Sequence, residues 1–309
     1  MIAQRRYMAA CALVMALSSS LTAGLLLVQP DQALAKNASE TKSSIKSIKW
    51  DEVEKQEDKS YATESITELK ISGQNFESSP NFKGTMNSRK NFDLACKEFN
   101  AAASANNICD DDDPARPEQY SQMFESASKA LGIPEVILLC MTGVESGFKY
   151  TAKSTDGAES EGLAQVTRKT APHLASLFDK DKHGFKSVAW ENFKKGSSPP
   201  MSSIPTPTKD TIRSTNPKDA PVQIFAMAMY LRNSIIGDHQ ELKQKNINLS
   251  TMDGLKKITH YLVASYNGGM GTGRIFLDSG MNDSSIEGPY TQRYFKRIDK
   301  CLDRMAKGF

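Results

Sequence analysis

The run VQIFAMAMYLRNSII, residues 222–236, constrains the fold most because it is apolar on nearly every side. A helix without a polar face has to be covered by other elements of the same domain. We therefore expect residues 222–236 to form a central, buried helix. Its methionines are expected to fill space in the core rather than to bind a metal.

Apolar residues recur at helical spacing on both sides of this run. The segment from Tyr120 to Leu131 ends at Gly132, and Pro134 suits the first turn of a second segment that runs to Glu145, so the two should form a hairpin. Further helical segments cover residues 255–265 and 294–305. Residues 147–165 are Gly-rich and weakly alternating, which favours a small β-element or an ordered loop. The pattern predicts a mainly α domain over residues 115–309.

The first residues predict export from the cytoplasm. Arg5 and Arg6 precede a long apolar stretch, and the small residues Ala33 to Ala35 then offer a cleavage site. An uncleaved membrane anchor is the alternative that the length of the stretch allows. The cleavage-like tripeptide favours residues 1–35 as a signal peptide, a periplasmic or secreted mature protein, and no stable membrane insertion.

Residues 36–114 are polar and rich in Lys, Ser, Glu and Asn, so they bury too little apolar surface to form a core alone. We expect an extended or partly ordered N-terminal arm that precedes the helical domain. The acidic run 110–114 lacks the alternating ligands and the glycine of a calcium loop, which makes it a solvated linker.

The charge of the mature chain excludes a nucleic-acid partner. Removal of Arg5, Arg6 and Asp31 with the signal peptide changes the formal net charge from +3 to +2, and no basic patch stands out. We expect a monomer. No metal site is expected either, because the mature histidines share no ligand spacing; they are His173, His183, His239 and His260.

Four cysteines remain after export, an even number that predicts two disulfides in an oxidising compartment. Three connectivities are open from the sequence. Of these we favour Cys96–Cys109 together with Cys140–Cys301.

The apolar segment 138–144 ends in a carboxylate, Glu145, followed by Ser146 and Gly147. Burial and the carbonyl end of a helix both disfavour the charged form, so the pKa of Glu145 is expected to rise. A carboxyl that keeps its proton near neutral pH is suited to act as a general acid. The alternative is an exposed helix-terminal glutamate without a catalytic role.

Four motifs follow one another along the domain: GVESGF (143–148), EGLAQVTRKTA (161–171), ASYNGGMGTGRI (264–275) and PYTQRYFKRI (289–298). In this order they resemble the motifs of the lytic transglycosylases of the soluble Slt type and of their goose-type lysozyme relatives. Two departures are Ala164, where that family has methionine, and Ser265, which is inserted between the alanine and tyrosine of the third motif.

The resemblance implies a lysozyme-like helical domain with a small β-element near a cleft that binds a peptidoglycan glycan strand. Glu145 would be the acid, Ser146 and Gln165 polar supports of the cleft, and Tyr266, Asn267 and Tyr294 its sugar-facing wall. The implied reaction breaks the β-1,4 bond between N-acetylmuramic acid and N-acetylglucosamine, and no cofactor is implied. One glutamate first protonates the leaving oxygen and then, as carboxylate, takes the proton of the muramic sugar's own primary hydroxyl, which closes an anhydro ring.

Extra carboxylates in the second motif region depart from the family pattern: Asp156, Glu159 and Glu161. One of them would position a water and make the enzyme a hydrolytic muramidase, in which acid and base stand well apart. Alternatively, they would attract deacetylated, cationic glycan, or form only a solvated acidic loop. A wall-binding module that keeps the fold but does no chemistry is a further alternative.

Overall fold

The computed structural model describes residues 70–71, 74–75, 88–101, 105–109, 115–154, 159–196, 203–249, 251–286 and 289–307. The predicted signal peptide, most of the predicted arm and Asp156 lie outside these ranges. All elements named below belong to the unit of residues 63–309.

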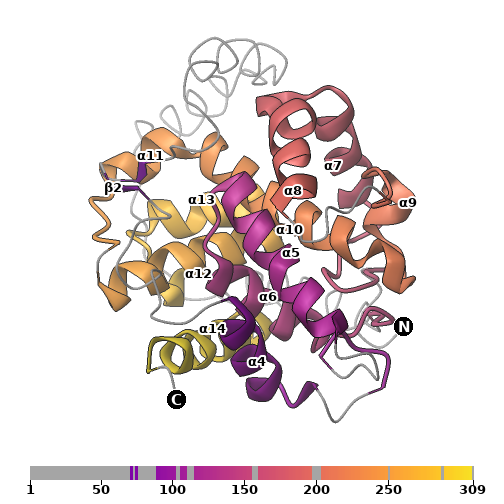
Figure 1. Cartoon of the computed structure of the whole chain (residues 1–309). Helices are drawn as coiled ribbons and strands as arrows, with labels where there is room; N and C mark the ends of the chain where they lie inside the picture. The colour runs from indigo at the N-terminus through magenta and orange to yellow at the C-terminus, as the bar shows by residue number, and fades with distance from the viewer. Residues whose placement is uncertain are drawn as a thin grey trace, which may run out of the picture. The chain divides into compact units, whose positions relative to one another are not determined.

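The described residues are mainly helical, as predicted (Figure 1). Two short strands, β1 (Lys70–Ile71) and β2 (Gln74–Asn75), pair antiparallel. The helices are α4 (Ser88–Glu98), α5 (Ala115–Leu131), α6 (Glu135–Ser146), α7 (Thr170–Asp179), α8 (Glu191–Gly196), α9 (Lys209–Ile212), α10 (Ala220–Gly237), α11 (His239–Gln244), α12 (Met252–Gly268), α13 (Met270–Asp278) and α14 (Pro289–Lys307). Short 3-10 turns at Lys182–Gly184, Pro217–Asp219 and Asp283–Ser285 and a π-helix at Phe185–Trp190 connect them.

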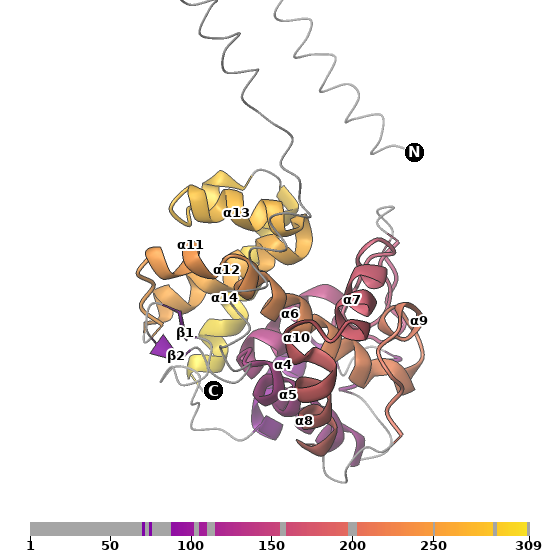
Figure 2. The same ribbon diagram turned by 90° about the horizontal axis from the view of Figure 1, so that it is seen from above.

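Helix α10 is the central element that the apolar run predicts. Nearly every side chain from Ala220 to Ile235 is buried, on all faces of the helix. Figures 1 and 2 show α10 among the other helices, and it packs against α5, α6, α7, α9 and α12. Because its neighbours surround it, the apolar residues need no polar face.

Helices α5 and α6 form the predicted hairpin. Gly132 adopts φ +66° after α5, a left-handed conformation that glycine takes without strain. Pro134 then caps α6, whose side chains are buried along most of its length. The helix ends at Gly147, also left-handed at φ +60°, whose N–H donates to the Gly143 carbonyl at 3.0 Å. The chain therefore turns sharply directly after Glu145 and Ser146.

Both favoured disulfides are present. Cys96 joins Cys109 across 13 residues, and Cys140 joins Cys301 across 161 residues. The second bridge fastens α14 to α6. Helix α14 buries one face against the core and carries its charged residues on the other, which explains the helical spacing of its apolar positions.

Helix α4 lies within the predicted polar arm, yet it packs against α5, α6 and α14. Phe92 and Ala95 are fully buried, and the Phe99 ring lies against Gly143 of α6, where a Cβ would come within 2.3 Å of the ring. We did not predict this helix from the sequence because its apolar residues are few. Residues 88–109 thus contribute to the core of the helical unit.

The region from residue 147 to 166 contains the predicted small β-element only as isolated bridges, which pair Lys153 with Glu161 and Glu161 with Val166. A third bridge joins Asn107 to Lys149, beside the end of α6. The Gly-rich residues 268–273 belong to the end of α12 and the start of α13, with a break at Gly269. Within the described part of the chain, no helix combines the length and apolar content that crossing a bilayer requires.

Candidate active site

Glu145 lies in the last turn of α6 and is partly buried. The hydroxyl of Tyr294 on α14 donates a hydrogen bond to Glu145 Oε1 at 2.8 Å, although the two residues are 149 positions apart in the chain. Burial and the Glu145 carboxylate raise the pKa of Tyr294 well above its ordinary value. The tyrosine therefore stays protonated and remains a hydrogen-bond donor to the carboxylate.

A cation lies at the same helix end. The guanidinium of Arg297, three residues beyond Tyr294, donates to the Val144 carbonyl at 3.3 Å and stacks over the Phe99 ring at 5.5 Å. The last carbonyls of a helix have no partner within it and carry partial negative charge, so a guanidinium here satisfies one of them and offsets the helix dipole. Arg297 thus offsets the dipole at the end of α6, the helix that carries Glu145.

Tyr266, near the end of α12, is bonded to the loop of residues 159–166 and lies within the electrostatic influence of Glu145. Its hydroxyl donates to the Ala164 carbonyl at 2.6 Å, and its ring meets the edge of Tyr230 at 5.1 Å between centroids. Burial, followed by the negative charge of Glu145, raises the pKa of Tyr266 well above its usual range. The fold therefore brings together three of the predicted site residues, from three different helices.

Gln165 is used inside the loop. Its Nε2 donates to the carbonyls of Ala152 at 3.0 Å and Gly162 at 2.8 Å, while its Oε1 accepts from the Ser160 hydroxyl at 3.1 Å. These bonds hold Gln165 at φ +49°, an uncommon conformation for a residue with a side chain. Both the nitrogen and the oxygen of this amide are therefore hydrogen-bonded to other residues of the loop region.

Gln223 anchors the loop to the central helix. This fully buried side chain accepts from the Leu163 N–H at 2.5 Å and donates to the Ser214 carbonyl at 2.6 Å. The contact requires glycine at position 162, where a Cβ would lie 2.2 Å from Gln223 Oε1. A buried amide with both ends paired fixes the position of Ala164, and therefore the partner of Tyr266.

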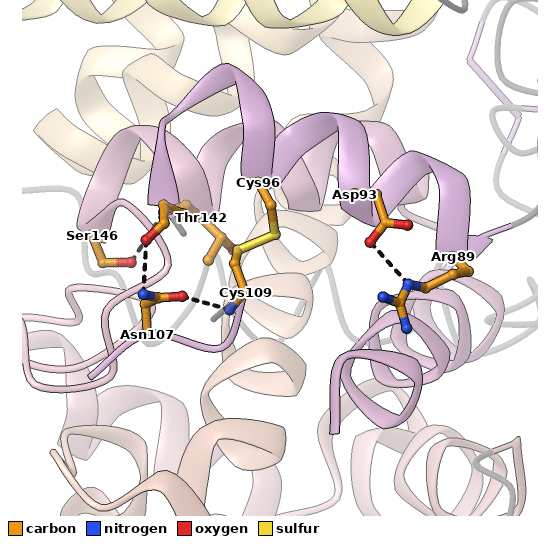
Figure 3. Close-up of a disulfide and its surroundings, with 8 residues drawn as sticks. Arg89, Asp93, Cys96, Asn107, Cys109, Thr142 and Ser146 are labelled. Carbon is orange, nitrogen blue, oxygen red and sulfur yellow. Dashed lines mark hydrogen bonds and ion pairs between the residues drawn. A yellow bond between two sulfur atoms is a disulfide. The ribbon is translucent and has the colours of Figure 1, made fainter. Parts of the chain in front are cut away.

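Two other predicted site residues are placed differently. The hydroxyl of Ser146 turns back to donate to the Thr142 carbonyl at 3.1 Å, in the corner beside the Cys96–Cys109 disulfide (Figure 3). Asn267 is exposed in the last turn of α12. The substrate-binding roles of both residues stay predictions.

The two described candidates for a second carboxylate are ion-paired. Glu159 lies 3.1 Å from Arg168, and Glu161 lies 3.4 Å from Lys153 and 3.5 Å from Arg213. Glu159 is exposed, whereas Glu161 is half-buried. Among the described residues, no group of three or more His, Cys, Asp and Glu side chains is arranged to hold a metal ion.

Sequence reasoning missed Gln223 and Arg297. A single amide in the otherwise apolar start of α10 was the available signal for Gln223, because a buried polar side chain needs partners. Arg297 follows Tyr294 at a helical spacing of three, which places both on the same edge of α14. Only the packing of α14 on α6 shows that this edge meets the end of α6.

Comparison with known proteins finds one match. Residues 122–191 match the family model described as Transglycosylase SLT domain. The matched segment runs from within α5 to the first residue of α8, and it includes Glu145 and the loop of residues 159–166. No curated protein and no solved structure matches the chain.

Proposed function

Since this chain carries a lysozyme-like domain of the soluble lytic transglycosylase type, we propose that it cleaves the β-1,4 bond between N-acetylmuramic acid and N-acetylglucosamine in peptidoglycan, with Glu145 as the acid and base. The observation that carries the proposal is the hydrogen bond from Tyr294 to Glu145. This bond joins the tyrosine of the motif at residues 289–298 to the carboxyl of the motif at residues 143–148, as expected if both motifs form one site.

In this proposal Glu145 first gives its proton to the glycosidic oxygen as the bond to the muramic C1 breaks. The resulting carboxylate then takes the proton of the muramic C6 hydroxyl, whose oxygen closes the anhydro ring and restores the acid. The Tyr294 hydroxyl supports the first step, because a donor to the carboxylate stabilises the anion that Glu145 becomes when it gives up its proton. No second protein carboxylate takes part, since the substrate's acetamido group stabilises the positive charge that develops at C1.

The ion pairs of the loop favour transglycosylation over hydrolysis. A carboxylate that activates water has to turn an oxygen toward the water beside the sugar, whereas Glu159 and Glu161 each have an oxygen turned toward a cationic side chain within 3.5 Å. The same neutralisation weakens any attraction for deacetylated, cationic glycan. The proposal also includes export to the periplasm or beyond, which the two disulfides support.

The test is digestion of purified peptidoglycan followed by mass spectrometry. We expect anhydro-muramic ends from the wild-type protein and none from Glu145→Gln, which removes the proton but keeps the shape of the side chain. Glu241→Gln, the same change at an exposed position of α11, is the matched control and should digest normally.

Other products would support the alternatives. Reducing ends that disappear in Glu159→Gln or Glu161→Gln would identify a hydrolytic muramidase. Faster digestion of deacetylated than of acetylated sacculi would restore the cationic-glycan interpretation. Binding to sacculi without cleavage, unchanged in Glu145→Gln, would identify a wall-binding module and refute the proposed reaction.

A further inference from the structure

Three successive contacts join one edge of α14 to the last two turns of α6. Cys301 is bonded to Cys140, Arg297 donates to the carbonyl of Val144 at 3.3 Å, and Tyr294 donates to Glu145 at 2.8 Å. On α14 these residues are separated by four and three positions, the spacing that places side chains on one edge of a helix. Residue numbers rise along α6 as they fall along α14, so the two edges run antiparallel.

The hydrogen bond at the end of this row depends on the register of the two helices. A helix advances 1.5 Å and turns by about 100° per residue, so a shift of α14 by one residue would take the Tyr294 hydroxyl out of bonding distance. Within this row the Arg297 contact is weak, because Arg297 is exposed and donates to a neutral carbonyl at the long end of the hydrogen-bond range. The buried face of α14, with Phe295 and Ile298, also opposes such a shift. The disulfide is the covalent member of the row, with Cα atoms 5.8 Å apart.

Disulfide geometry tolerates only a narrow range of Cα separations, roughly 4.4–6.8 Å, so the bridge limits sliding of α14 on α6 to a small part of a helical turn. Between Cys301 and Tyr294 lie two turns of continuous helix, which pass this constraint to the tyrosine. The second disulfide lies near the same end of α6, but it bonds neither α6 nor α14, since it joins α4 to Cys109 and closes a short loop.

We propose that the Cys140–Cys301 disulfide is a positioning element of the candidate active site, which sets the register of α14 on α6 so that Tyr294 holds the carboxylate of Glu145. The inference rests on the proposed function for its catalytic meaning. The ionisable groups that bear on Glu145 include Tyr294 and Arg297 from α14 and Tyr266 from α12. Of these, Tyr294 is the one whose bond to Glu145 depends directly on the register.

The expected consequence is a change in proton affinity as well as in stability. A hydroxyl that donates to a carboxylate favours its charged form, and a hydrogen bond to a charged group alters the ionisation constant by a factor of about ten. Loss of the register should therefore make Glu145 hold its proton to a pH about one unit higher.

The experiment is an NMR titration of the Glu145 carboxyl carbon in the full mature protein, with the signal assigned by its absence in Glu145→Gln. We expect the double variant Cys140→Ala/Cys301→Ala and the single variant Tyr294→Phe each to move the titration upward by about one pH unit. Their combination should move it no further than either alone. The matched control Cys96→Ala/Cys109→Ala should melt at a lower temperature with an unchanged titration.

An unchanged titration in the folded Cys140→Ala/Cys301→Ala protein would overturn the inference, because the bridge would then only stabilise the fold. If that protein does not fold, Cys140→Val/Cys301→Ala, which restores lost volume, is titrated in its place with the same two outcomes. The titration needs no substrate. Wild-type protein that fails to cleave peptidoglycan would therefore refute the proposed function alone, and cleavage with an unchanged titration would refute the inference alone.

Discussion

Substitution of Gly162 by alanine tests whether Gln223 positions the loop beside the candidate site. Gly162 adopts φ +77°, and a Cβ there would lie 2.2 Å from Gln223 Oε1 and 2.4 Å from the Ser214 carbonyl. The left-handed conformation costs an L-residue about 1–2 kcal/mol, and forcing an extra methyl into a packed site costs about 1–3 kcal/mol more. We expect Gly162→Ala to lower the free energy of unfolding by about 2–5 kcal/mol.

Gly280 provides a matched control, because it also has φ +77° but no atom within 4 Å of the added Cβ. Gly280→Ala should cost only the backbone term of about 1–2 kcal/mol. Both free energies are measured by urea unfolding. At temperatures where both variants are folded, only Gly162→Ala should raise KM in peptidoglycan clearing, because the loop carries the carbonyl that Tyr266 binds. Equal losses of stability in the two variants, with equal KM values, would refute the role given to Gln223.

Three further predictions concern stability. Burial raises the pKa of Glu135 to about 7, so the native state is destabilised as the pH rises from 4.5 to 7. In urea unfolding, Glu135→Gln should therefore raise the free energy of unfolding by up to about 3 kcal/mol at pH 8 and leave it unchanged at pH 4. Burial alone would lower the pKa of His260, but Asp299 and Asp283 outweigh burial and raise the pKa. His260→Gln should lower the free energy of unfolding by about 2–3 kcal/mol below pH 6.5, and calorimetry should show this loss shrinking as the pH rises through the native pKa. Loss of the disulfide between α6 and α14, which spans 161 residues, should cost about 5 kcal/mol, against about 3 kcal/mol for the one that spans 13, and a larger loss from the shorter loop would contradict the chain-entropy description.

The helices that sequence predicted are those with a strong pattern. The apolar run of α10, the Gly132 and Pro134 boundary between α5 and α6, and the periodic face of α14 depend on local spacing, which the chain displays directly. Helix α4 and the Gly-rich start of α13 have weaker local preferences. Their helices depend on neighbours, such as the Phe99 ring that packs on Gly143, and these neighbours are not visible from spacing.

The candidate site divides in the same way. Glu145, Tyr266 and Tyr294 were found because ordered motifs mark them, and the structure bonds Tyr294 to Glu145 and Tyr266 to the Ala164 carbonyl of the loop. The partners of Gln165 and the ion pairs of Glu159 and Glu161 could not be predicted, since they depend on a loop conformation with residues at positive φ. The sequence identifies Glu159 and Glu161 as carboxylates, but only the fold shows which cationic side chains pair with them.

The burial of α4 has a practical consequence for anyone who dissects this chain. A fragment that began at residue 115, where the sequence texture changes, would lack the Phe92 side chain from the core and the Phe99 ring from between Gly143 and Arg297. Such a fragment would expose one side of α6, the helix that carries Glu145, and would remove the aromatic ring on which the Arg297 guanidinium stacks. The smallest autonomous piece of this protein therefore extends at least 27 positions upstream of residue 115, to the first turn of α4 at Ser88.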